Sequence, residues 1–178
     1  MNRITIFLLA SLLVGTVCAG HRLGDIQPGF ACVGIPQVER RLGSIELAAQ
    51  DKNGVSKYSG KQGGFEAVVV YHCDRGQLTE QEIIFTTTTQ GKAYQIANEL
   101  RKDLANNFGE PIHDGLNLKV WRTMMFGVMG ADLDYLTSVV VWGREKEDLM
   151  LSVREKDDKL WVIVISQGSS KMEYILNS

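Results

Sequence analysis

One stretch, residues 91–111, most strongly limits what the chain can fold into. Its apolar residues recur at three- and four-residue steps while charged residues fill the other side; the apolar set is Ala93, Ile96, Ala97, Leu100, Leu104 and Phe108. This period predicts an amphipathic helix with one buried stripe. Gly109 can adopt the left-handed conformation just past the last turn, and Pro111 prevents the helix from resuming. We therefore expect a helix that ends near Phe108, with the strands of the fold before and after it.

Residues 1–19 have the features of a cleaved secretory signal peptide. Arg3 gives a short positive start, residues 4–14 form an apolar run, and Val17-Cys18-Ala19 precedes a cut before Gly20. The apolar run is shorter than the roughly 20 residues that a membrane-spanning helix needs, and no later run approaches that length. A lipoprotein cut before Cys18 is the alternative, although Val17 suits it poorly. We expect residues 20–178 to form one periplasmic or secreted domain with no transmembrane segment after cleavage.

The charge balance argues against nucleic acid as a partner. Loss of Arg3 with the signal peptide changes the formal net charge from −2 to −3. A protein that binds nucleic acid needs a concentration of Lys and Arg to displace phosphate counterions, and no stretch here has one. The hydrophobic fraction of 44% is ordinary for a globular chain, so we expect a folded domain.

Removal of the signal peptide also removes Cys18, and two cysteines, Cys32 and Cys73, remain. An even pair in an exported chain predicts a disulfide bond. The alternative is a nucleophilic Cys73 with His72 as its base. Because consecutive side chains in a strand point to opposite faces, His72 is poorly placed for that role.

The residues before the long helix predict a short helix and antiparallel strands. We expect residues 20–31 to be an irregular lead-in and residues 34–43 to be a helix, with Pro36 in its first turn, Gly43 at its end, and Glu39 in solvent. Strands are predicted at residues 45–49, 55–59, 65–73 and 78–87, with Asn53-Gly54 in the first hairpin turn. Residues 59–64 are rich in glycine, but a strand follows them instead of the helix that a phosphate-binding loop requires, so we interpret them as a flexible turn.

The residues after the long helix predict a second set of strands, at residues 116–123, 138–142, 149–154 and 160–166. Charged turns separate the last three, which is typical of an antiparallel meander. The fold class is therefore α+β, with antiparallel sheet packed against two main helices.

The two parts of the chain also suggest a degenerate duplication of a helix-then-meander unit. Residues 38–44, VERRLGS, align with residues 104–110, LANNFGE, and residues 67–71, AVVVY, align with residues 138–142, SVVVW. The predicted repeats cover residues 30–88 and 89–168. Two unrelated helix-then-meander segments would look similar, so both interpretations stay open.

Motifs for catalysis, cofactors or metals are missing from the sequence. No HxxxH, HxH or CxxC spacing occurs, and no Gly-x-Ser-x-Gly element is present. We expect neither a cofactor nor a metal. The alternative hypothesis of an enzyme or small-molecule carrier relies on a cleft between the two parts, with His113, Asp114 and Trp121 at its rim.

The most unusual stretch is residues 124–135, MMFGVMGADLDY, in a predicted connection between strands. If exposed, its large side chains form an adaptable apolar surface for another protein; they are Met124, Met125, Phe126, Met129 and Tyr135. Burial of the connection against the sheet is the competing structural interpretation. Soft-metal handling by the methionine thioethers is a second alternative function.

These observations favour an exported protein that binds another protein and is not an enzyme. An inhibitor, an immunity factor against an exported toxin and an accessory of envelope assembly all fit that description.

Overall fold

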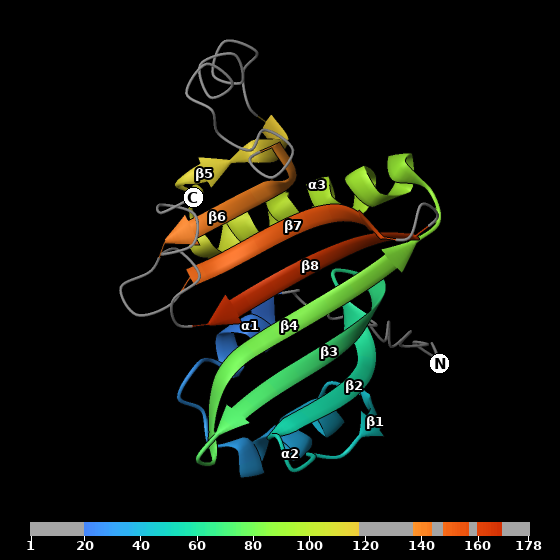
Figure 1. Cartoon of the computed structure of the whole chain (residues 1–178). Helices are drawn as coiled ribbons and strands as arrows, with labels where there is room; N and C mark the ends of the chain where they lie inside the picture. The colour runs from blue at the N-terminus through green and yellow to red at the C-terminus, as the bar shows by residue number, and fades with distance from the viewer. Residues whose placement is uncertain (1–19, 118–136, 144–147, 157–159, 169–178) are drawn as a thin grey trace, which may run out of the picture.

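The computed structural model of the chain describes residues 20–117, 137–143, 148–156 and 160–168. Its strands form one antiparallel sheet, and the helices lie behind it in the view of Figure 1. The N-terminal half, residues 20–87, contains α1 (Gly20–Asp25), η1 (Cys32–Gly34), α2 (Ile35–Arg41), β1 (Ile45–Ala48), β2 (Val55–Gln62), β3 (Phe65–Asp74) and β4 (Gln77–Thr87). The C-terminal half, residues 90–168, contains α3 (Gln90–Phe108), β5 (His113–Asp114), η2 (Gly115–Asn117), β6 (Val139–Gly143), β7 (Asp148–Lys156) and β8 (Leu160–Gly168).

In the described residues the sheet has eight strands in the order β1-β2-β3-β4-β8-β7-β6-β5, and all neighbours are antiparallel. This arrangement confirms the predicted α+β class with antiparallel sheet. Among the described strands, β4 and β8 are the pair through which the two halves meet. Reading outward from that pair, each half runs through its strands in reverse chain order.

The long helix α3 confirms the prediction from its apolar period. Ala93, Ile96, Ala97, Leu100 and Leu104 are buried, and Phe108 packs against the core from a half-buried position. Each fully buried leucine stabilises the fold by about 1.5–3 kcal/mol relative to an exposed one. Gly109 follows the helix with φ +84°. Glycine adopts a positive φ more readily than other residues because it has no Cβ. The helix packs on β4, β7 and β8.

The short helix α2 is also confirmed, with Pro36 in its first turn and Gly43 at φ +74° after its end. Two expectations for this region are wrong. The lead-in begins with a helix, α1, and Glu39 is buried instead of lying in solvent. Sequence periodicity places Glu39 on the same face as Ile35, Val38 and Leu42, and tertiary contacts decide that this face goes inside.

The β1–β2 hairpin forms where the Asn-Gly pair predicts it. The Asp51 carboxylate accepts hydrogen bonds from the backbone N–H groups of Asn53 (2.8 Å) and Val55 (2.9 Å). Gly54 has φ +79°, and a Cβ at this position would come within 2.0 Å of the Cys73 carbonyl oxygen. No other residue type fits this turn without moving β3.

Strand β2 is longer than predicted, because residues 59–62 continue it instead of forming a flexible turn. Its backbone pairs with β3 as far as Gln62 and Phe65. The turn itself is limited to Gly63 and Gly64, which have φ +58° and +82°.

The main core lies between the helices and the sheet. Its largest fully buried side chains include Trp142, Tyr71 and Phe85. A second set of buried valines lies on the other face of the sheet, outside that core cluster; it comprises Val70, Val139, Val141, Val162 and Val164. In β3 this face carries Val70, which is buried, and Val68, which is half-buried.

The segment that follows α3 differs from prediction. His113 and Asp114 form the short strand β5, for which no strand was predicted, and residues 115–117 form the 3-10 helix η2 where a strand was expected to begin. The rest of the predicted strand 116–123 lies outside the described residues. A two-residue strand carries no period that a sequence pattern can reveal.

The order of strands bears on the suggested duplication. By position in the sheet, β3 corresponds to β7 and β2 to β6. The alignment of residues 67–71 with residues 138–142 pairs β3 with β6, so it joins strands that occupy different places. The matched helix ends do agree, since Gly43 and Gly109 both follow a helix with positive φ. The duplication itself stays a prediction.

Candidate functional site

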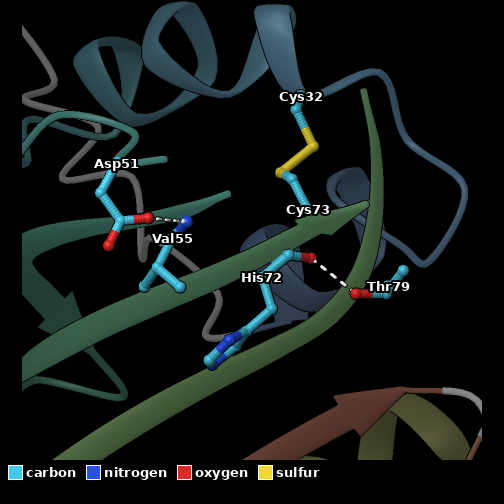
Figure 2. The surroundings of a disulfide bond; sticks show 6 residues. All are labelled: Cys32, Asp51, Val55, His72, Cys73 and Thr79. Carbon is cyan, nitrogen blue, oxygen red and sulfur yellow. Dashed lines mark hydrogen bonds between the residues drawn. A yellow bond between two sulfur atoms is a disulfide. The ribbon is translucent and has the colours of Figure 1, made fainter. Parts of the chain in front are cut away.

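The predicted disulfide is present and joins η1 to the end of β3 (Figure 2). The Cα atoms of Cys32 and Cys73 are 6.4 Å apart. The backbone N–H of Cys32 donates to the Gly76 carbonyl at 2.9 Å, and Ala31 forms a β-bridge with Gln77. The disulfide therefore holds the segment before α2 against the β3–β4 turn, and its role is that of a structural clamp.

The surroundings of Cys73 do not assemble a nucleophile. Its sulfur is part of the disulfide, and Figure 2 shows the His72 ring pointing away from it. The His72 Nε2 atom lies 3.7 Å from the Glu82 carboxylate, and the His72 carbonyl accepts a 2.9 Å hydrogen bond from the Thr79 hydroxyl.

A buried ion pair, which the sequence reasoning missed, links α1 to α2. Arg22 is 3% exposed and Glu39 is 0% exposed. The Arg22 Nε and Nη2 atoms donate to the two Glu39 carboxylate oxygens at 2.8 and 3.1 Å, and the Tyr71 hydroxyl donates to the same carboxylate from β3. Such a bidentate pair is the strongest form of Arg–carboxylate contact. It fixes both short helices to the sheet.

The remaining donors of Arg22 reach other polar groups. Nη1 donates to the Lys61 carbonyl and to the Gln62 side-chain oxygen, both at 3.1 Å, and Nη2 donates to the Ser44 hydroxyl at 2.9 Å. Gly60 makes room for this arrangement, because a Cβ there would lie 2.6 Å from the Ser44 hydroxyl and 3.1 Å from Arg22 Nη2. A glycine inside a strand is the sequence signal that indicates such a close approach.

Burial also changes the acidity of two tyrosines at this cluster. Desolvation, and then the neighbouring Glu39 carboxylate, raise the pKa of Tyr71 far above its ordinary value. Desolvation likewise raises the pKa of Tyr58, whose ring meets that of Tyr71 edge-on at 5.9 Å between centroids. Both phenols are therefore protonated at neutral pH, and the Tyr71 hydroxyl donates to Glu39.

The residues of the alternative cleft are only partly described. Asp114 forms a bidentate ion pair with Arg101 of α3, and each side chain is 20% exposed. This contact raises the pKa of Arg101. His113 precedes Asp114 in β5, and consecutive strand residues point to opposite faces. The structure thus places Asp114 toward α3 and His113 on the other side of the sheet. Trp121 lies outside the described residues, so the cleft as a whole stays a prediction.

The predicted partner-binding connection also lies outside the described residues. This applies to Met124, Met125, Phe126, Met129 and Tyr135, and to the soft-metal hypothesis that depends on the three methionines. Among the residues that the structure does describe, no group of three or more His, Cys, Asp or Glu side chains could hold a metal ion. None of the described helices has the length and apolar character needed to cross a membrane.

The exposed large apolar side chains of the described residues lie at both edges of the sheet and in η1. Ile45 is 70% exposed and Leu47 is 55% exposed, and both belong to the edge strand β1. Ile112, beside the opposite edge strand β5, is 62% exposed, and Val33 in η1 is 89% exposed. Sequence reasoning identified the strand at residues 45–49 but missed its position at the edge, because the order of strands in a sheet leaves no local signal.

Comparison with known proteins adds no assignment: no family model matches this chain, and neither a curated protein nor a solved structure matches it.

Proposed function

We propose that the chain is an exported, non-catalytic domain that binds another protein, and that β1 contributes the recognition surface. The exposure of Ile45 and Leu47 on this edge strand is the observation that carries the proposal. The partner is a protein of the envelope or the exterior. An inhibitor, an immunity factor or an envelope-assembly accessory would use such a surface.

The edge position gives β1 the means to bind an extended segment. β1 pairs with β2 on one side, and among the described strands it is the terminal one on the other side. An edge strand presents a row of N–H and C=O groups to which another chain can pair. In recognition by strand addition, these main-chain groups supply affinity and the side chains supply specificity. Ile45 and Leu47 would contribute the apolar contacts.

The bulge in β1 favours a limited contact over open-ended association. The register with β2 shifts between Glu46 and Ala48, which leaves Leu47 as the extra residue. Bulges of this kind twist an edge and interrupt its hydrogen-bonding pattern. An added strand would therefore be short, which suits a specific partner better than unlimited growth of the sheet.

The Cys32–Cys73 disulfide supports the exported location in this proposal. Disulfides persist in the periplasm and outside the cell, whereas cytosolic reductants keep most thiols reduced. The signal-peptide features of residues 1–19 also favour export.

A paired substitution tests the recognition surface. The oxidised mature protein is immobilised, incubated with an envelope extract, and compared with the double variant Ile45→Lys and Leu47→Lys. We expect the variant to lose capture of the partner, with the affinity of the purified pair reduced about 10-fold or more, because two apolar contacts are replaced by charges.

The matched control is Val33→Lys, which places the same charge at an exposed apolar residue outside β1. It should bind the partner like the unsubstituted protein. Thermal unfolding of all three proteins checks that each is folded. Equal capture by the double variant and by the control would refute β1 as the recognition surface, and a protein that captures no partner in any extract would count against the proposed function.

A further inference from the structure

Two glutamines face each other on the middle pair of strands of the sheet, close to the end of β8. Gln81 of β4 lies directly opposite Gln167 of β8, and both are 0% exposed. This position is on the strand pair through which the two halves meet. Glutamine is seldom fully buried, so a pair of them in one place requires an explanation.

Both side chains lie on the face that the helices cover. Across the strands, Gln81 is opposite Tyr71 and Gln167 is opposite Leu149, and these two neighbours belong to the main core cluster. α3 packs on both β4 and β8. Ser166, which also has a buried and unbonded hydroxyl, precedes Gln167 in the strand and therefore faces the other way.

The amide groups have no hydrogen-bond partner among the described residues. This holds for the Nε2 and Oε1 atoms of both Gln81 and Gln167. Each amide offers two donors and an acceptor oxygen. Tyr71, the residue opposite Gln81 on β3, already donates its hydroxyl proton to Glu39. Since buried side-chain amides are nearly always bonded, a further group must satisfy them.

We propose that Gln81 and Gln167 together hold buried water, one or two molecules, between the sheet and the helices. Water can donate and accept at once, which matches two neutral amides that offer both kinds of group. A charged ligand would have no opposite charge in this row of the sheet, because its other described members are Ser56, Tyr71, Leu149 and Trp142. Internal water typically makes two to four hydrogen bonds, and two amides supply that number.

The site has a consequence for how the halves join. A shift of the β4–β8 register by one residue would turn one amide toward the other face of the sheet and separate it from its partner. The shared water therefore favours the observed β4–β8 register over registers shifted by one residue. The nearby pair Ile83 and Ile165 would not set the register alone, because each would pack similarly with other apolar residues.

Detection of the water in the unsubstituted protein is the first test. In NMR spectra of the oxidised mature protein, the side-chain NH₂ protons of Gln81 and Gln167 should show cross-peaks to long-lived water. A crystal structure at high resolution should show solvent density about 2.7–3.2 Å from both amides. Amides bonded directly to each other, with no solvent density and no cross-peaks, would overturn the proposal.

Leucine substitutions provide a second test. Gln81→Leu or Gln167→Leu alone should lower the Tm by about 5 °C, because the remaining amide loses half of its bonded network. The double variant should regain most of that loss and lose the water signal, because no polar group is left unpaired. The control Gln95→Leu, on the exposed side of α3, should change neither the Tm nor the water signal. Strictly additive losses in the double variant would contradict the shared site.

Discussion

Both halves of the protein consist of sheet covered by helices, but different interactions hold the helices in place in each half. In the N-terminal half, two short helices are held by a disulfide and by the Arg22–Glu39 ion pair. In the C-terminal half, one helix of 19 residues packs an apolar stripe on the sheet. Both charges that are buried in the described residues belong to the N-terminal half.

Helix length explains this difference. α2 has seven residues, which is well below the length at which a helix is stable by itself, and it can bury few apolar side chains. Covalent and ionic links compensate for the missing apolar area. α3 needs no such link, because its five buried residues follow one continuous face. The two halves therefore cover the sheet with helices by different interactions, and the stability of each half should respond differently to mutation.

Removal of the disulfide should have the largest effect. A double Cys32→Ala and Cys73→Ala variant should lose about 4 kcal/mol of unfolding free energy, as expected for a sequence separation of 41 residues. Denaturant titration measures the loss. Hydrogen exchange should show that amide protection falls more in β2 and β3 than in β7. Equal falls throughout the sheet would mean that the halves unfold as one unit and that the contrast between them is only architectural.

Loss of the buried carboxylate should have the next largest effect. Glu39→Gln leaves the Arg22 guanidinium buried without its counter-charge, and we expect a loss of about 3 kcal/mol. The control Glu66→Gln removes an exposed carboxylate that pairs with Lys61, and it should change stability by about 0.5 kcal/mol at most. Chemical denaturation at neutral pH compares them. Similar losses in the two variants would show that the ion pair does not stabilise the N-terminal half.

Loss of the Asp51 carboxylate in the β1–β2 turn should have the smallest effect on stability, and this effect should depend on pH. The hydrogen bond from the Val55 N–H lowers the pKa of Asp51 in the folded protein, with further help from Asn53. Because the folded pKa lies below the unfolded one, the contribution of Asp51 is complete above about pH 4 and is lost as the pH falls through the folded pKa.

The stability difference between the unsubstituted protein and Asp51→Ala should therefore shrink as the pH falls from 6 to 2.5. Thermal unfolding across this range measures it, and Asp74→Ala serves as the control at an exposed turn carboxylate of the neighbouring hairpin. A stability difference that stays constant with pH would show that the charge of Asp51 does not stabilise the turn.

Sequence patterns determined the parts of this fold that depend on neighbours along the chain. The three- and four-residue period predicted α3, the Asn-Gly pair predicted the first hairpin, and two glycines with positive φ end the two predicted helices. The Cys32–Cys73 bond was predicted because two cysteines leave one pairing. In each case the physical cause acts within one element or within one pair of residues.

Tertiary structure alone decided the features that depend on residues distant in the sequence. Only the folded chain shows that Glu39 meets Arg22 and Tyr71, that β1 lies at the edge of the sheet, and that Asp114 pairs with Arg101. Burial of a charge becomes favourable only when its partners arrive from other elements, and an edge exists only once the strand order is set. Local propensity carries no information about either, because both are properties of how complete elements pack.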